Sequence, residues 1–276
     1  MTANAELHKA RDGQGLRGFS NLFGKESRAW WGTHRWWVNG LLWTGVLCGL
    51  TAIMLFLPNE EVFAASAAEV ALAGGETAYT LWIGLNVFFE FGVSLLAIGT
   101  VVLSQDLIIG ERHSGVAEWL LSKPVRRHAY IWAKVTANAL PVLLLLVGLP
   151  SIVTYGIASL RLGTPFPVMP FLSGVGIMAL NTWFYLSLTL MLGTLFNSRG
   201  PILGVALASI LGGGLLGGFI EPLFWITPWM LPKVAWLTAT GQAISAEMRL
   251  SALVATTVWS AAFILVALMQ FEKTEY

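Results

Sequence analysis

Long uncharged apolar runs alternate with short charged clusters along this chain. A helix needs about 20 predominantly apolar residues to cross the hydrocarbon core of a membrane. Five runs reach that length without a charge, and a sixth is interrupted only by Glu90. Allowing for a proline-rich hairpin at 164–167, the pattern predicts six membrane-spanning helices, over residues 36–57, 79–108, 130–160, 169–196, 201–220 and 250–271.

The composition supports this interpretation. Hydrophobic residues make up 56% of the chain and charged residues 11%, whereas soluble domains carry about 25% charged residues. We therefore expect an all-α integral membrane protein whose transmembrane domain covers residues 36–276. Residues 1–18 are polar and predict a disordered cytoplasmic tail.

The positive charges predict the orientation in the membrane. Thirteen of the sixteen Lys and Arg residues fall on the side that six spans would give to both termini. Because Lys and Arg favour the cytoplasmic side, we expect a multi-pass protein of the cell (inner) membrane with both termini in the cytoplasm.

Residues 19–35 precede the first span and predict an amphipathic helix lying in the membrane surface. Apolar and basic side chains alternate there at helical spacing, and Trp30 is expected at the headgroup level with Trp31, Trp36 and Trp37. A plain interfacial anchor and a contact with a partner subunit both stay open.

The polar loop at 109–130 predicts a short helix parallel to the membrane. Val116, Trp119 and Leu120 are expected on one face of it, and Pro124 ends it near Ser122, since proline disfavours helix in the preceding residue. Basic residues after it, Lys134 among them, are expected at the cytoplasmic surface. An ordinary amphipathic connector explains the spacing equally well.

A second irregular segment, residues 221–246, is apolar and aromatic but contains Pro222, Pro228 and Pro232. It cannot form one straight span. We expect two short re-entrant helices dipping into the outer leaflet, because irregular backbone at membrane depth needs protein or a water-filled cavity around it. A plain interfacial loop is the alternative.

Glu90 is the one charge well inside a predicted span. Such a carboxylate usually faces the protein interior or a cavity, so Glu90, Asn86 and Phe89 are candidates for a transport pathway. The alternative is a buried carboxyl group that is protonated or is bonded to Asn86 or Asn181. Asp106, nearer the cytoplasmic end, is expected to pair with Arg112.

The spans offer too few His, Asp, Glu or Cys residues for a metal site. All four histidines lie in cytoplasmic or interfacial segments, which argues against a Ser–His protease. We therefore predict no catalytic residue, no metal site and no enzyme activity in this chain.

Two stretches match a known pattern. One joins Glu111-Arg112-His113-Ser114-Gly115 to Leu120-Leu121-Ser122-Lys123-Pro124-Val125-Arg126-Arg127 and Lys134, and the other is Lys25-Glu26-x-Arg28. They resemble the cytoplasmic loop and N-terminal helix of type-2 ABC export permeases. Six spans, cytoplasmic termini and a re-entrant segment before the last span complete the resemblance.

The resemblance implies that two permease copies pair, identical or related, and that two ATP-binding-cassette ATPase subunits dock below them. The helix Glu111–Ser122 would be the coupling helix. The implied coupling residues are Glu111, Arg112, Gly115, Trp119, Pro124 and Arg127, and those of the N-terminal helix are Lys25, Glu26 and Arg28.

The chain has no Gly-x-x-x-x-Gly-Lys-Ser/Thr phosphate loop. ATP and Mg are therefore expected on the ATPase partner, with no cofactor bound by this chain, and no nucleic-acid partner is expected. The aromatic spans suggest export of an amphipathic, lipid-like or drug-like substrate. A secondary, ion-coupled transporter and a permease serving assembly of an extracytoplasmic metalloenzyme stay open as alternatives.

Overall fold

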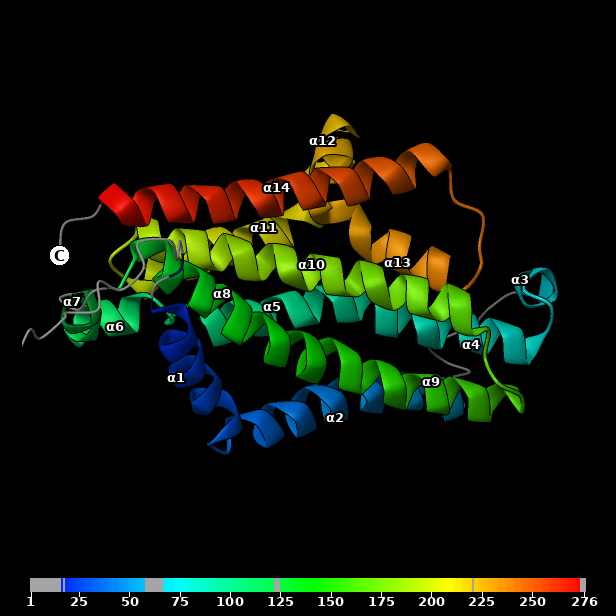
Figure 1. The fold of residues 1–276 in the computed structure, drawn as a ribbon. Coiled ribbons are helices and arrows are strands. Elements are labelled where there is room, and N and C mark those ends of the chain that lie inside the picture. The colour runs from blue at the N-terminus through cyan, green and yellow to red at the C-terminus, as the bar shows by residue number, and fades with distance from the viewer. Residues whose placement is uncertain (1–15, 17, 58–66, 122–124, 220, 274–276) are drawn as a thin grey trace, which may run out of the picture.

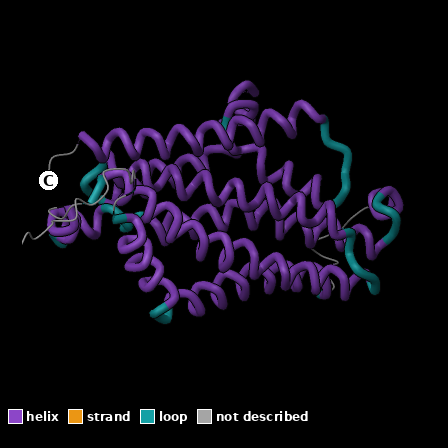
Figure 2. Tube along the Cα trace, viewed as in Figure 1, coloured by secondary structure: helices purple, strands orange, loops and turns teal. Residues whose placement is uncertain are grey.

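The computed structural model describes residues 16, 18–57, 67–121, 125–219 and 221–273, and every regular element among them is helical. The all-helical class predicted from the sequence is thus confirmed. The long helices lie side by side in one bundle (Figure 1), and loops gather at its two ends (Figure 2). The elements are α1 (Phe19–Trp31), α2 (Arg35–Phe56), α3 (Ala67–Leu72), α4 (Glu76–Asn86), η1 (Val87–Phe91), α5 (Gly92–Ser104), α6 (Ile109–His113), α7 (Val116–Leu121), α8 (Arg127–Val142), η2 (Leu143–Gly148), α9 (Leu149–Leu162), α10 (Val168–Leu195), α11 (Arg199–Phe219), α12 (Glu221–Ile226), η3 (Pro228–Met230), α13 (Leu231–Ala239) and α14 (Ala246–Lys273).

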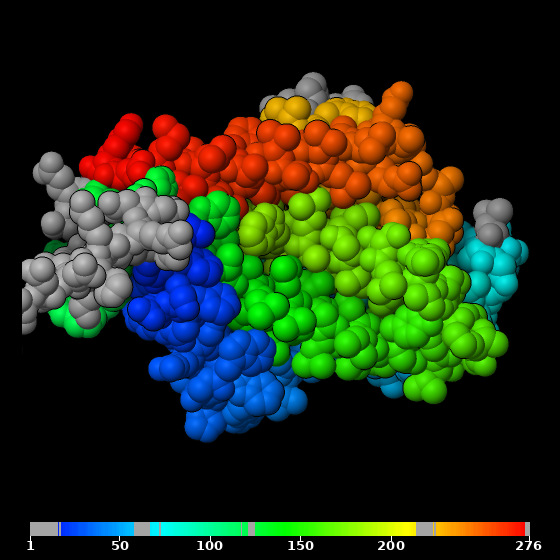
Figure 3. Space-filling view, in the orientation of Figure 1, coloured from blue at the N-terminus to red at the C-terminus, as the bar shows by residue number. Residues whose placement is uncertain are grey.

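Five helical runs in the described residues are long and apolar enough to cross a membrane: Arg35–Phe56, Glu76–His113, Arg127–Leu162, Val168–Leu195 and Ala246–Lys273. Each overlaps one predicted span. The remaining predicted span, 201–220, corresponds to α11, whose apolar stretch Arg199–Gly213 falls among the shorter helices. On the face shown in Figure 3, α14, α10 and the α8–α9 run form adjoining bands.

Two of the long runs contain a π-helical segment. η1 lies between α4 and α5, and η2 lies between α8 and α9. η2 is flanked by Pro141 and Pro150, which have no backbone N–H to donate, so the regular hydrogen-bond ladder is interrupted there. Such π-bulges are rare and often occur at functional positions.

The first span packs closely on the second because glycines leave room for its side chains. A Cβ atom added at Gly84 or Gly99 would lie 2.5 Å from a side-chain carbon of α2, and one added at Gly92 would lie 2.9 Å away. The α2 side chains that fill these places lie at four- and eight-residue spacing, on one face of the helix: Trp43, Leu47 and Leu55.

The proline-containing segment before α14 forms the short elements α12, η3 and α13, so it is not one straight span, as predicted. α13 packs against α10 and η1 within the bundle. The approach is closest at Gly174 of α10, where an added Cβ would lie 2.6 Å from the Cβ of Ala239. The indole of Trp236 donates a hydrogen bond of 3.2 Å to the carbonyl of Trp82 on α4.

Candidate functional site

Two lysines and two glutamates meet where α1, α6 and α8 converge at one end of the bundle (Figure 1). The Nζ of Lys134 lies 3.0 Å from Oε1 of Glu26 and 3.1 Å from Oε2 of Glu111. Lys25 forms a second ion pair with Glu111. The hydroxyl of Tyr130 donates to Oε2 of Glu111 at 2.6 Å. These five side chains are called the charge cluster below.

Burial makes the charge cluster interdependent. The side chain of Lys134 is only 2% exposed, and those of Glu26 and Glu111 are 11% and 16% exposed. A buried charge costs several kcal/mol unless it is paired and hydrogen-bonded. With two carboxylates facing two ammonium groups, the cluster is formally neutral. Each element therefore holds the others in place.

The contact between α1 and α8 continues below the cluster. The indole of Trp30 donates a hydrogen bond of 2.7 Å to Oδ1 of Asn138. Glu26 and Trp30 are four residues apart, as are Lys134 and Asn138, so each pair lies on one face of its helix. The two contacts follow the same order along both helices, which means that α1 and α8 run in the same direction.

This arrangement adds protein contacts to two expectations. Trp30 is 1% exposed and faces α8, so its indole packs against protein, and the side chain of Lys134 is buried between α1 and α6. The face of α1 that carries Glu26 and Trp30 packs against α8, where Lys134 and Asn138 supply the polar partners of these two side chains. The helix also ends at Trp31, and a turn separates it from α2, which begins at Arg35.

The predicted coupling helix is two short helices. α6 ends at His113 and α7 begins at Val116, with Gly115 between them at φ +70°. This left-handed conformation is readily adopted by glycine and costs other residues energy. The single helix Glu111–Ser122 is therefore wrong, although α7 ends at Leu121, close to the expected residue. Pro124 lies outside the described residues.

The α7 side chains do not share one environment. Leu120 is buried and Val116 is packed against the same core, whereas Trp119 is 60% exposed. All three still lie on one face of α7, as predicted, because residues three and four apart share a helix face. Trp119 lies at the exposed edge of that face. An indole so exposed on a short polar loop is available to a binding partner.

α6 is also fastened to the turn between α10 and α11. Arg112 donates from Nη1 to the carbonyl of Phe196 at 3.2 Å and to Oδ1 of Asn197 at 2.8 Å. A ring nitrogen of His113 lies 2.9 Å from the carbonyl oxygen of Asn197. These contacts link α6 to the ends of two further long helices.

Asp106 pairs with Arg199, the first residue of α11, through two hydrogen bonds of 2.9 and 2.8 Å. The predicted pairing of Asp106 with Arg112 is therefore wrong. The bidentate geometry of this pair suits a guanidinium facing a carboxylate, and it adds a connection between the second span and α11.

Arg127 and Arg28 occupy different positions around the cluster. Arg127 begins α8 and donates from Nη1 to the carbonyl of Glu272 at 2.5 Å, at the end of α14. A cation at that helix end is favourable because the carboxyl end of a helix carries partial negative charge.

Tyr130 stacks on Phe271 of α14 with ring centroids 4.7 Å apart. Arg28 is exposed on α1.

The pathway candidates lie in the second span. Asn86 donates to Oε2 of Glu90 at 2.5 Å, which confirms one of the two bonded alternatives; Asn181 instead donates to the carbonyl of Val93. Glu90 lies in η1 and is half-buried. Phe89 is fully buried, 5.3 Å from the ring of Phe171. In the conformation described here, Phe89 belongs to the core of the subunit.

Among the residues that the structure describes, no group of three or more His, Cys, Asp and Glu side chains could hold a metal ion. The polar partners that sequence reasoning missed are Tyr130, Asn138 and the buried Lys134. Their spacing of four residues on a predicted span was a usable signal, because it places three polar side chains on one helix face.

An all-helical bundle with five helical runs long and apolar enough to cross a membrane, counted among the described residues, indicates an integral membrane protein. Residues 20–276 match the family described as ABC-2 family transporter protein. This chain belongs to that family and is thus the membrane subunit of an ABC transporter. A search of curated proteins found no match to this chain.

Proposed function

We propose that this chain is the permease of an exporter driven by separate ATPase subunits, and that α6 and α7 are the element on which an ATPase docks. The observation that carries this proposal is the charge cluster, which connects the polar loop to α1 and to the third long run. A docking loop can move its membrane helices only if it is rigidly attached to them.

The contacts supply such an attachment by three routes. Through Glu111 and Lys134, a displacement of α6 is passed to α8, and through Lys25 it is passed to α1 and on to α2. Through Arg112 and Asn197 it reaches the α10–α11 turn. The exposed Trp119 on α7 is the side chain that we assign to the ATPase contact.

The proposed layout in the membrane follows from the charges. The end of the bundle with α1, α6 and α7 would face the cytoplasm, together with both termini. α11 would complete six spans, and α12 and α13 would lie in the outer leaflet. Two permease copies and two ATPase subunits would make the transporter, with ATP and Mg bound by the ATPases. The substrate class that we propose is an amphipathic, lipid-like or drug-like molecule.

Co-purification tests this proposal. The tagged full chain is co-expressed with candidate ATP-binding-cassette ATPases of the same organism and isolated from the membrane. We expect one ATPase to co-purify, and Trp119→Ala to lower its recovery strongly while Trp225→Ala, an exposed tryptophan on α12, leaves it unchanged. If transport activity is retained with no ATPase in the complex, the chain is an ion-coupled transporter and the proposal is wrong.

A further inference from the structure

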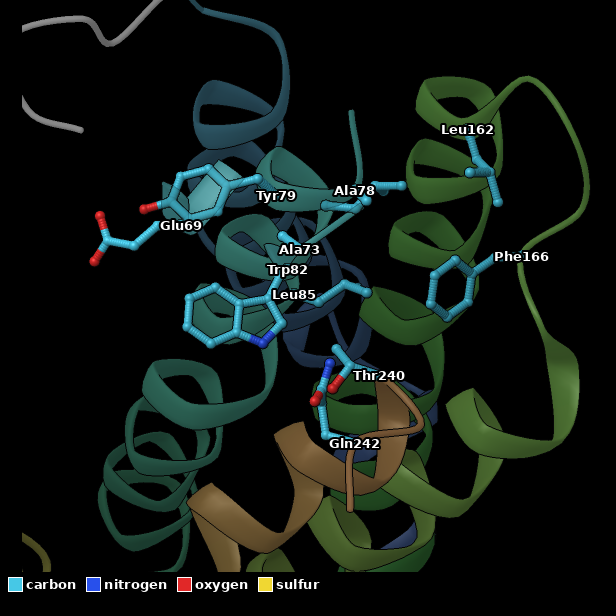
Figure 4. A pocket seen from close by; sticks show the side chains of 11 residues that line it. Glu69, Ala73, Ala78, Tyr79, Trp82, Leu85, Leu162, Phe166, Thr240 and Gln242 are labelled. Atoms are coloured by element: carbon cyan, nitrogen blue, oxygen red, sulfur yellow. The ribbon is translucent and has the colours of Figure 1, made fainter. Parts of the chain in front are cut away.

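A pocket of about 450 Å³ opens at the end of the bundle opposite to α6 and α7. Its walls come from α3 and α4 on one side and from the end of α9 and the following loop on the other, and the loop after α13 contributes Thr240 and Gln242 (Figure 4). A pocket of this size is in the range that accepts small organic ligands. It lies within one subunit.

One wall combines aromatic rings with an acid. Tyr79 and Trp82 are stacked with ring centroids 6.1 Å apart, and Glu69 lies beside Tyr79 in Figure 4. Indole and phenol faces attract cations, above all quaternary ammonium groups, and a carboxylate adds a charge of the opposite sign. This wall therefore has the chemistry of a site for an alkylammonium headgroup.

The facing wall is apolar. Leu162 and Phe166 line it, and Leu81 and Leu85 line the pocket from α4. Such a surface suits an alkyl chain or another hydrocarbon body, because burying it there removes apolar area from water. Together the two walls fit an amphiphile with a positive head and an apolar body.

Both walls are held in place by hydrogen bonds. The backbone N–H of Phe166 donates to the hydroxyl of Ser159 at 3.1 Å, and its carbonyl accepts from Tyr155 at 2.9 Å. The ring of Trp82 lies 4.7 Å from that of Trp236, whose indole also binds the Trp82 carbonyl. The pocket is therefore formed before any ligand enters, which lowers the entropy cost of binding.

The charge around the pocket favours a cation. Glu69 is the one charged side chain among the described residues that line the pocket. Arg161 lies next to Leu162 at the end of α9 but is not among the residues that line the pocket. The negative potential of the Glu69 carboxylate would concentrate cations at the opening.

We infer that this pocket is a binding site for a cationic amphiphile, with the ammonium head between Glu69, Tyr79 and Trp82 and the hydrocarbon body against Leu162 and Phe166. A role of this site in export rests on the proposed function. Binding of the ligand does not rest on it, because the residues of the permease chain alone form the pocket.

Equilibrium binding of radiolabelled dodecyltrimethylammonium to the full chain alone tests the inference. The protein is held in dodecyl maltoside micelles, and the signal of protein-free micelles is subtracted. We expect saturable binding that an excess of dodecanol, which has the same chain and no charge, does not displace.

The variants place the ligand. Glu69→Gln and Trp82→Leu should each weaken binding by about tenfold, since each removes a group that attracts the cation. The matched controls, Glu76→Gln at the start of α4 and Trp225→Leu on α12, should bind as the wild type does. Glu69 is exposed, so its variant stays informative even if Trp82→Leu fails to fold.

Three results would overturn the inference: no saturable binding, displacement of the cation by uncharged dodecanol, or full binding by Glu69→Gln. No ATPase is present in this experiment. A chain that binds the cation but recruits no ATPase contradicts only the proposed function, and one that recruits the ATPase but ignores the cation contradicts only this inference.

Discussion

Lys134 and Glu26 are separated by 108 positions in the sequence, yet the Nζ of one lies 3.0 Å from Oε1 of the other in a buried ion pair. This contact fixes the N-terminal helix on the third long run. Because Glu111 shares the same ammonium group at 3.1 Å, the pair also holds the polar loop, so one lysine connects three separate segments of the chain.

Replacing Lys134 tests this connection. Lys134→Met leaves two buried carboxylates without their main partner, and breaking a buried pair in this way costs about 3–5 kcal/mol. We expect the purified variant to unfold at a clearly lower temperature. Lys233→Met, which changes an exposed lysine on α13, is the control. Equal thermal stability of both variants would show that the cluster holds nothing together.

The hydrogen bond between Trp30 and Asn138 gives a second prediction. Trp30→Phe keeps an aromatic ring but leaves the buried Asn138 oxygen without its indole donor, which should cost about 1–3 kcal/mol. Trp31→Phe, at an exposed position, should have almost no effect. The measurement is thermal unfolding followed by tryptophan fluorescence, with each variant's lost tryptophan taken into account. If the two variants behave alike, α1 is not fixed on α8 as described.

A third prediction concerns the packing of the first span on the second. Gly99→Ala would place a Cβ 2.5 Å from the ring of Trp43, and overpacking of this kind costs about 1–3 kcal/mol. Gly49→Ala, on α2 itself, meets no atom within 4 Å and serves as its counterpart. The fraction of monodisperse protein after heating should fall for the first and not for the second. The reverse order would mean that the two spans are packed through other faces.

A fourth prediction concerns the turn between α6 and α7. Gly115→Ala forces an L-residue into a positive φ, which costs about 1–2 kcal/mol. We expect weaker ATPase recruitment with little change in overall stability, because the strain is confined to the loop. Gly24→Ala, in the helical α1 with open space around it, should recruit normally. Normal recruitment by both variants would show that the shape of this turn is not used for docking.

The sequence predicted the apolar runs well because hydropathy depends on composition over some 20 residues. It predicted one polar contact, that of Asn86 with Glu90, but not the partners of Lys134 and Asp106. The charge of Lys134 was considered alone, and only the fold shows that Glu26 and Glu111 reach it. Asp106 was assigned to Arg112 from proximity along the chain, whereas the fold brings Arg199 to it.

Backbone details were also beyond the sequence. The break of the loop helix at Gly115 depends on a φ angle, and the π-helical segment η1 has no proline in it or next to it that would predict it. The pocket between α3, α4 and the α9–α10 loop joins residues from four separate segments. Such relationships are set by tertiary contacts, which local patterns do not encode.

The central claim, that the charge cluster couples the polar loop to the membrane helices, is tested most directly by ATP hydrolysis of the assembled transporter in lipid. Wild type is compared with Glu111→Gln and with Glu247→Gln, an exposed glutamate at the start of α14. Since a hydrogen bond to a charged group contributes about 1.5–3 kcal/mol, we expect Glu111→Gln to lower the permease-dependent rate by roughly tenfold or more. The ATPase should still be recruited, and Glu247→Gln should match wild type. An unchanged rate with Glu111→Gln would contradict the account.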